Sequence, residues 1–242
     1  IRCVGKYLYD NDIDGITEKH GRKTDNTEKI TIETEAGVKT LILYKQNGKV
    51  TSVTVDMGAP YFAPEKLPAL LEAQPLSPLN LVAGSGAEAM QAAIKSGLLP
   101  ERAIVNAPFT VGVRDYRVTC VGVGNPHCVV FSHFVDKEPL SEIGPKFEHH
   151  KVFPERTNTE FVRVVGPNEL KMRTWERGNG ETLCCGTGAC AAAIAAVLNG
   201  YCPLGEDITV RVRGGTIHVR YTGETVYLTG GAMLCYEGVV EV

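Results

Sequence analysis

A run of small apolar residues in the last third of the chain constrains the fold more than any other feature. The segment Cys185-Gly-Thr-Gly opens the run, residues 189–198 are nearly all small and apolar, and Asn199-Gly200 closes it. This pattern predicts a helix with a glycine-rich start and an Asn-Gly stop. A helix that is apolar on every side must be buried on every side. Its small side chains also let neighbouring backbone come close.

Most of the remaining pattern predicts short strands joined by tight turns. The strands are expected at residues 30–32, 41–44, 53–57, 117–123, 127–132, 159–165, 169–175, 208–213, 216–221 and 225–229. Asn47-Gly48 is typical of a two-residue type I′ hairpin turn. Tight turns between successive strands indicate antiparallel pairing. We therefore expect an antiparallel α+β protein and not a doubly wound βαβ fold.

Two further helices are expected outside this β pattern. Ile1, Val4 and Leu8 fall on one face of a helix at the start of the chain. Ser85-Gly-Ala-Glu88 reads as a capping box that opens a second helix. Between them, Gly58-Ala59-Pro60 ends a strand and is the candidate domain boundary.

The composition argues against several classes of function. The formal net charge is -3, which gives no electrostatic reason to expect a nucleic acid or an anionic membrane as partner. The apolar runs are too short for a bilayer span, and no signal peptide is visible. The eight cysteines include no C-x-x-C pair, so we expect no structural zinc site. No site for another metal or for an organic cofactor is visible, so we expect no cofactor. A chain of this size does not need disulfides for stability, and the missing secretion signal favours the reducing cytoplasm.

Cys185 is the strongest candidate for chemistry. It stands at the expected N-terminus of the buried helix, where free N–H groups and the helix dipole stabilise an anion. The pKa of this thiol is therefore expected to fall, and the amides of Gly186 and Thr187 could hold a carboxylate. The alternative is a packed core thiol beside a tight turn.

Three other segments carry polar residues at strand ends. Glu176-Arg177 is a charged pair that ends an apolar-patterned strand and leads into the turn before Cys185. The pair either belongs to the site around Cys185 or is an exposed ion pair at the end of a strand. In G-N-P-H, His127 is either part of a plain turn or a general base or carboxylate partner. Asn158, just before a strand, either caps it or recognises a polar ligand through its amide.

Together, these segments resemble the signatures of a known family. G-N-P-H, R-T-N-x-E-F and E-R-G-x-G-E-T-x-x-C-G-T-G-A, in this order, are similar to those of the diaminopimelate epimerases. The opening I-R-C-V-G-K-Y-L-Y-D resembles the segment that follows that family's first catalytic motif, C-G-N-G. The resemblance covers residues 1 to about 60 and about 108 to 242.

The resemblance implies a cofactor-independent isomerase that interconverts LL- and meso-diaminopimelate with two cysteines. One, as thiolate, removes the α-proton, and the other, as thiol, returns a proton on the opposite face. The product serves lysine and cell-wall precursor synthesis. The implied roles are acid/base for Cys185, α-carboxylate binding for Gly186 and Thr187, binding of the rest of the substrate for Asn125, Asn158, Glu176 and Arg177, and tuning of the thiols for His127 and Glu176.

The resemblance also implies two similar domains, each a mostly antiparallel sheet wrapped round a central helix, with a small amino-acid substrate in the cleft between them. We expect the first domain to hold residues 1–60 and 231–242, and the second residues 61–230. The sequence does not decide whether the chain forms a homodimer, and it assigns no role to residues 61–108. Because C-G-N-G does not occur in the sequence, we expect the chain as given not to epimerise.

Three alternatives remain at this stage. The first is another isomerase of the superfamily, proline racemase-like or phenazine-biosynthesis-like. The second is a thiol hydrolase that uses Cys185 and His127. The third is a non-catalytic binding module.

Overall fold

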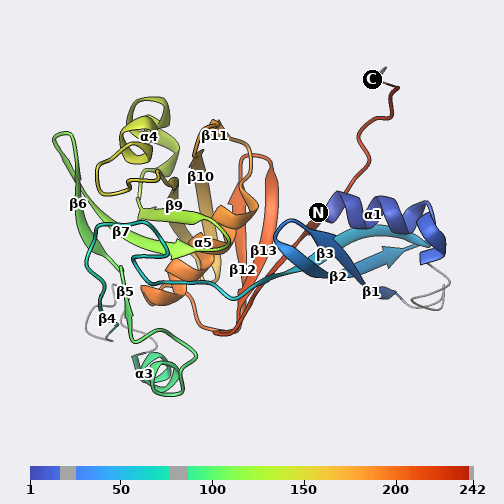
Figure 1. Cartoon of the computed structure of the whole chain (residues 1–242), viewed down its shortest axis with the longest axis horizontal. Coiled ribbons are helices and arrows are strands. Elements are labelled where there is room, and N and C mark those ends of the chain that lie inside the picture. Colours follow the sequence, from blue (N-terminus) through green and yellow to red (C-terminus); the bar gives the residue numbers. More distant parts are fainter. Residues whose placement is uncertain (17–25, 77–86, 240–242) are drawn as a thin grey trace. The chain divides into compact units, whose positions relative to one another are not determined.

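The computed structural model describes residues 1–16, 26–76 and 87–239 (Figure 1). The chain divides into two compact units, of which the first holds Ile1–Asp56 and Leu228–Val242 and the second holds Met57–Tyr227. The assignment of these units to the two domains that the resemblance implies, with limits at residues 60 and 230, stays a prediction.

The first unit is built on an antiparallel sheet. β1 (Thr27–Thr34), β2 (Gly37–Gln46) and β3 (Lys49–Gly58) follow one another in the strand order, and β14 (Val226–Gly231) lies next to β3. The apolar side chains alternate along these strands, so one face of the sheet is buried. The turn between β2 and β3 has positive φ at Asn47 (52°) and Gly48 (76°), as a type I′ turn requires. The hairpin prediction is confirmed.

The predicted first helix is confirmed, but its buried face is not the predicted one. α1 (Arg2–Asp10) is followed by a short 3-10 turn, η1 (Ile13–Gly15). Its buried residues are Gly5 and Tyr9, whereas Ile1 and Val4 are 43% and 48% exposed. A Cβ on Gly5 would lie 2.6 Å from a leucine of β2. The small residue therefore decides which face packs on the sheet, and a count of apolar residues does not show this.

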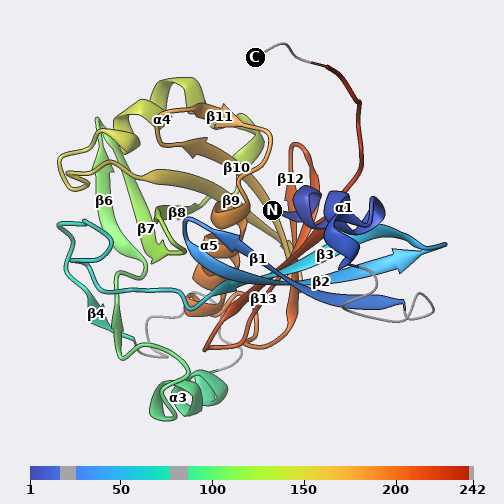
Figure 2. The same cartoon turned by 45° about the vertical axis from the view of Figure 1, so that its right-hand side comes forward.

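The second unit is a curved sheet that surrounds one helix (Figure 2). Its strand order is β13-β12-β10-β9-β8-β7-β6, and β11 pairs with β10. The bounds are β6 (Ala107–Val111), β7 (Arg114–Gly122), β8 (Pro126–Phe131), β9 (Asn158–Gly166), β10 (Glu169–Glu176), β11 (Gly180–Thr182), β12 (Asp207–Val212) and β13 (Gly215–Tyr221). The central helix is α5 (Gly186–Leu198), which is buried from Gly188 to its end. The prediction of a fully buried helix is confirmed.

Most neighbouring strands in this sheet are antiparallel, as predicted, but two pairs are parallel. β8 runs parallel to β9, and β10 runs parallel to β12. In each case the chain makes a long crossover between the two strands, and such a connection permits parallel pairing. The crossover between β10 and β12 contains α5. Turn signals report only sequential hairpins, so they did not reveal these two pairs.

The outer face of the sheet carries another helix, α4 (Leu140–Glu148), which the sequence did not predict. It follows the 3-10 turn η3 (Val135–Lys137) and contains Pro145. Glycine and proline within it disfavour a helix locally. Its apolar side chains pack into an aromatic cluster, where Phe147 lies 5.4 Å from both Phe109 and Phe161 between ring centroids. Tertiary packing thus overrides the local preference.

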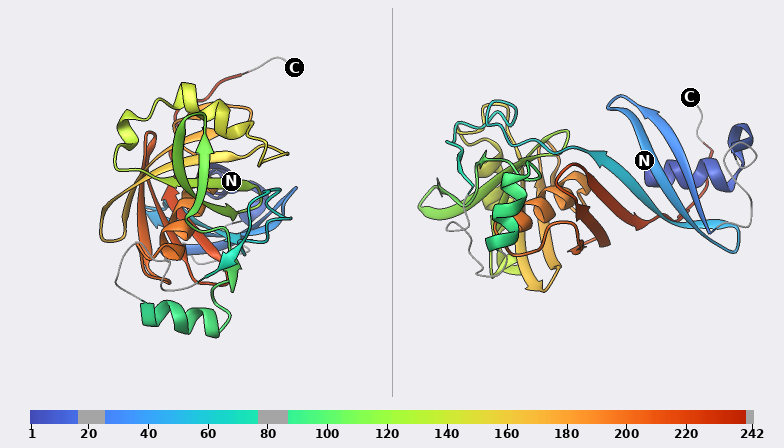
Figure 3. Two further views of the ribbon diagram at one scale, coloured as in Figure 1. Left: turned by 90° about the vertical axis from the view of Figure 1, so that its left-hand side faces the viewer. Right: turned by 90° about the horizontal axis from the view of Figure 1, so that it is seen from below.

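The helix predicted after the capping box at Ser85 is present as α3 (Ala87–Lys95). Ser85 itself lies outside the described residues, so the capping box is not tested. Helix α3 lies at the margin of the unit, away from the strands around α5 (Figure 3, left). A two-stranded ladder of β4 (Gln74–Pro75) and β5 (Arg102–Ala103) completes the unit. None of the helices in the described part of the chain is long and apolar enough to cross a membrane.

Candidate active site

Cys185 caps the N-terminus of the buried helix α5. Its backbone is extended (φ -116°, ψ 113°), and the next residue begins the helix. The sulfur accepts a hydrogen bond from the backbone N–H of Gly188 at 3.3 Å and lies 3.5 Å from Thr187 Oγ1. The amides of Gly186 and Thr187 belong to the first turn, which has no acceptors within the helix. The predicted position of the thiol is therefore confirmed.

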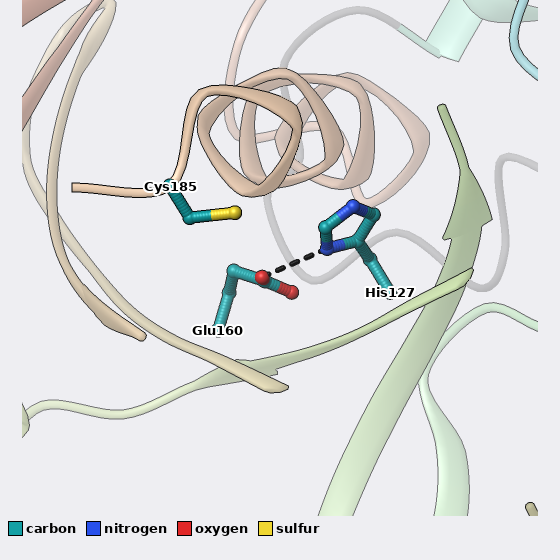
Figure 4. A group of neighbouring side chains, drawn as sticks. All are labelled: His127, Glu160 and Cys185. Carbon is teal, nitrogen blue, oxygen red and sulfur yellow. Dashed lines mark hydrogen bonds and ion pairs between the residues drawn. The ribbon is translucent and has the colours of Figure 1, made fainter. Parts of the chain in front are cut away.

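His127 and Glu160 form a buried pair on neighbouring strands beneath this turn. His127 lies at the start of β8 and Glu160 in β9, and neither side chain is exposed. His127 Nδ1 lies 2.8 Å from Glu160 Oε1, and His127 Nε2 lies 2.8 Å from Asn125 Oδ1. Figure 4 shows that the imidazole, the carboxylate and the sulfur of Cys185 point toward one another. The G-N-P-H segment is the turn between β7 and β8, as the plain reading has it, and His127 also has a carboxylate partner. Its role as a general base stays a prediction.

These three side chains bring ligand-type atoms together. One atom each from His127, Glu160 and Cys185 lies within 4.8 Å of the others. Nitrogen, carboxylate oxygen and sulfur are also zinc ligands, so the group could hold a metal as well as move a proton. Glu160 Oε2 is buried and has no hydrogen-bond partner among the described residues. One carboxylate oxygen is thus available to a ligand or a proton.

The expected direction of the Cys185 pKa is wrong. Burial is the largest cause, and it raises the pKa of this thiol from its ordinary value to about 12. The negative charges of Glu160 and Glu176 raise it further, while hydrogen bonds from Thr187 and Gly188 lower it. The helix N-terminus does favour the thiolate, but desolvation and two carboxylates outweigh it. In the described arrangement Cys185 is therefore a protonated thiol at neutral pH.

The space around Gly188 explains why the Cys185-Gly-Thr-Gly motif has a glycine at its last position. A Cβ at this position would lie 2.5 Å from Glu160 Oε1 and 3.1 Å from Cys185 Sγ. Contacts under 3 Å to a carboxylate held by His127 would force the site apart. The glycine therefore lets the helix start, the thiol and the carboxylate share one small space.

The other predicted site residues lie at the adjoining turn after β10. Glu176 ends this strand, and its Oε1 accepts a hydrogen bond from Thr182 Oγ1 at 2.5 Å. The backbone N–H of Arg177 donates to Asn158 Oδ1 at 3.0 Å, and Asn158 Nδ2 donates to a backbone carbonyl of β8 at 2.8 Å. Asn158 is buried, so its amide ties the turn to the sheet. The guanidinium of Arg177 is bonded to the carbonyl of Glu155 at 3.1 Å.

Curated proteins similar to this chain are named diaminopimelate epimerase. That of Desulfovibrio desulfuricans is 42% identical over 240 residues, which cover 98% of this chain and 71% of that protein. That of Agathobacter rectalis is 39% identical over 244 residues, which cover 100% of this chain and 74% of that protein. The chain belongs to the diaminopimelate epimerase family. The family model described as diaminopimelate epimerase matches residues 119–235.

Two solved structures have a fold similar to that of this chain. A probable proline racemase from Agrobacterium radiobacter has a TM-score of 0.60 at 13% identity, over 98% of this chain and 66% of that one. A hydroxyproline epimerase from Agrobacterium vitis has a TM-score of 0.56 at 14% identity, over 97% and 64%. The chain thus spans about two thirds of the length of these structures. At such identities the likeness concerns the fold alone.

The structure adds Glu160 to the site residues expected for a diaminopimelate epimerase. It belongs to the R-T-N-x-E-F segment, but only Asn158 was singled out there. The sequence did carry one signal for Glu160. It is a charged residue directly before the apolar Phe161-Val162 of a predicted strand, which indicates a buried carboxylate. The fully buried carboxylate needs a partner, and His127 supplies it from the neighbouring strand.

Proposed function

We propose that Cys185 is one of the two acid/base groups of an enzyme that interconverts LL- and meso-diaminopimelate, and that the 242-residue chain, which lacks a C-G-N-G motif, does not epimerise as given. The observation that carries the proposal is the thiol at the N-terminus of a buried helix, within 4.8 Å of His127 and Glu160. The curated relatives named diaminopimelate epimerase support the substrate. The other acid/base is the cysteine of the C-G-N-G motif, which the resemblance implies.

The raised pKa suits Cys185 to deliver the proton. A thiol with a pKa of about 12 is protonated at neutral pH and faces an α-carbon that has become a carbanion. Proton transfer converts the thiol to a thiolate, which the N–H of Gly188 and the helix N-terminus stabilise. In the reverse direction that thiolate takes the α-proton. Glu160 and Glu176 raise the basicity of the thiolate because both place negative charge near it.

The helix start also serves the substrate carboxylate. The amides of Gly186 and Thr187 hold the α-carboxylate, and they stabilise the negative charge that develops at the α-carbon. The second amino-acid group of the substrate is bound by Asn125, Asn158, Glu176 and Arg177. The Arg177 side chain is suited to a bidentate grip on a carboxylate. His127 holds Glu160 and so sets the field around the thiol.

α-Hydrogen exchange in D2O tests this function. LL-diaminopimelate is incubated with the 242-residue chain and with a two-thiol form, in which a family-like C-G-N-G segment and the region upstream of it are added, and exchange is followed by NMR. We expect exchange and epimerisation with the two-thiol form, and a loss of about 100-fold or more in its Cys185→Ser variant. Substitution of the exposed neighbour Cys184→Ser is the matched control.

The alternatives give different results in the same samples. Exchange of proline but not diaminopimelate would indicate a proline racemase-like enzyme. Labelling of Cys185 by an acyl or peptide electrophile with turnover would indicate a thiol hydrolase. Binding of diaminopimelate by the folded two-thiol form without any exchange would leave a binding module and would end the epimerase proposal.

Location and assembly are part of the same proposal. Thiol acid/base chemistry needs reduced sulfur, and Cys185 forms no disulfide. We place the enzyme in the reducing cytoplasm, with a small amino acid as its substrate. Whether it works as a homodimer is measured by sedimentation of the active form.

A further inference from the structure

We propose that Glu148, at the end of α4, is a positioning residue that holds the turn bearing Glu176 and Arg177. This rests on the proposed function, because that turn binds the substrate there. Glu148 belongs to none of the motifs in the sequence. Its side chain is only 5% exposed, so its carboxylate must be stabilised by partners within the protein.

The partners of Glu148 lie on both sides of the substrate-binding pair. Its Oε2 accepts a hydrogen bond from Trp175 Nε1 at 2.8 Å, and its Oε1 accepts one from the backbone N–H of Gly178 at 3.0 Å. Trp175 directly precedes Glu176, and Gly178 directly follows Arg177. One carboxylate therefore spans the two residues that the proposed function uses.

A second side chain acts on the same turn from another element. The N–H of Arg177 donates to Asn158 Oδ1 at 3.0 Å, and the N–H of Gly178 donates to Glu148. Two successive backbone amides are thus bonded by side chains, one from β9 and one from α4. Within the turn, the N–H of Asn179 donates to the carbonyl of Glu176 at 3.0 Å. These anchors fix the turn in position as well as in shape.

Helix α4 is shaped to receive Trp175. A Cβ on Gly144 would lie 2.2 Å from the indole atom Cδ2, so the ring packs where the helix has no side chain. Gly144 and Glu148 are four residues apart and share one face of the helix. Gly144 makes room for the ring, and Glu148 accepts its N–H. The anchor therefore has a steric part and a hydrogen-bonding part.

The chemistry requires a carboxylate at this position. Both groups that face Glu148 are donors, and an ionised carboxylate offers acceptors only. A glutamine of nearly the same shape has one acceptor oxygen, and its NH2 group would face an N–H. Arg156 Nη1 lies 3.6 Å from Glu148 Oε1 and offsets the negative charge. Glu148→Gln therefore breaks one anchor with little change in volume.

Hydrogen exchange and kinetics of Glu148→Gln test the proposal, with the exposed Glu142→Gln on the same helix as matched control. Amide exchange by mass spectrometry of peptides covering residues 176–182 should be about tenfold faster or more in Glu148→Gln and unchanged in Glu142→Gln. In the form that is active on diaminopimelate, KM should rise about tenfold while kcat changes less than about threefold.

Each result decides the question. Unchanged exchange at the turn would overturn the proposal whatever the substrate is. Faster exchange with unchanged KM would also overturn it, because the turn would be free without consequence for binding. If the two-thiol form with an intact Glu148 does not act on diaminopimelate, the proposed function fails, and the exchange data alone then decide whether Glu148 holds the turn. Trp175 is the only tryptophan, so its fluorescence checks that the variant is folded around the indole.

Discussion

His127 Nδ1 lies 2.8 Å from Glu160 Oε1, and both side chains are completely shielded from solvent. The imidazole thus holds the carboxylate in place while its second oxygen lacks a partner among the described residues. This fixed charge is one of the causes that raise the pKa of Cys185. The pair therefore sets the electrostatics of a thiol that comes from a different element.

Glu160→Gln should lower the pKa of Cys185. The substitution removes a negative charge that disfavours the thiolate, and its side-chain oxygen can still accept from His127. At fixed pH the thiolate fraction rises, by roughly tenfold for each unit that the pKa falls. Alkylation of Cys185 by iodoacetamide, followed peptide by peptide, should be faster than in the unsubstituted protein. The exposed Cys184 serves as internal control, and equal rates at Cys185 would contradict the electrostatic account.

The free energy of unfolding should fall as the pH rises above about 9. The pKa of Cys185 is raised to about 12 and that of Cys202 to about 11, each mainly by burial, from an ordinary value of 9.0. Between these values the unfolded chain loses protons that the folded chain keeps. The unfolded state then binds fewer protons, so stability decreases with pH.

For each thiol the loss is at most about 1.4 kcal/mol per pH unit. Urea unfolding at about pH 8, about 9.5 and about 10.5 measures the slope. Cys185→Ala should make the slope less steep over the range from about 9 to about 12, because one of the buried groups with a raised pKa is gone. A slope that is the same in this variant would show that Cys185 titrates alike in both states.

Gly188→Ala should impair the site more than an ordinary helix substitution does. Alanine favours a helix over glycine by about 1 kcal/mol, so a helix effect alone would stabilise the protein. The new Cβ would instead lie 2.5 Å from Glu160 Oε1, and such overpacking costs roughly 1–3 kcal/mol. We expect a lower urea midpoint and a large loss of α-hydrogen exchange. Unchanged stability and activity would show that the carboxylate can move aside freely.

Most parts of the fold that local signals specify were predicted correctly, although β6 alternates between buried and exposed residues and was not predicted. Strand alternation, the Asn47-Gly48 turn and the apolar run after Cys185 each act over a few residues, and the structure confirms them. Helix α4 was missed because its Gly-Pro pair disfavours a helix locally, and only packing against distant aromatic residues stabilises it.

The candidate site divides in the same way. The place of Cys185 at a helix N-terminus follows from its own neighbours in sequence. The direction of its pKa does not, because the burial and the Glu160 charge that determine it come from other strands. Glu160 itself carries no local mark beyond being charged in an apolar strand. Pairing across β8 and β9, which are parallel and distant in sequence, is what brings it to His127.

Lys45→Met should strongly destabilise the first unit. Lys45 has no role in the chemistry proposed for Cys185, so the expected effect is on stability. Lys45 Nζ lies 3.6 Å from Glu28 Oε2 and donates to Tyr9 Oη at 2.9 Å. The side chains of Lys45 and Glu28 are 3% and 4% exposed. Loss of one partner of a buried ion pair costs about 3–5 kcal/mol, because the remaining charge stays buried.

The double variant Lys45→Met, Glu28→Gln is the control that separates charge from packing. It removes both charges, so it should recover most of the stability lost in Lys45→Met, because no uncompensated carboxylate remains. Urea unfolding of the two variants beside the unsubstituted protein measures the difference. If single and double variants unfold at the same midpoint, the loss comes from packing or from the Tyr9 hydrogen bond. The Glu28 charge would then be solvated well enough in the folded chain to need no cation.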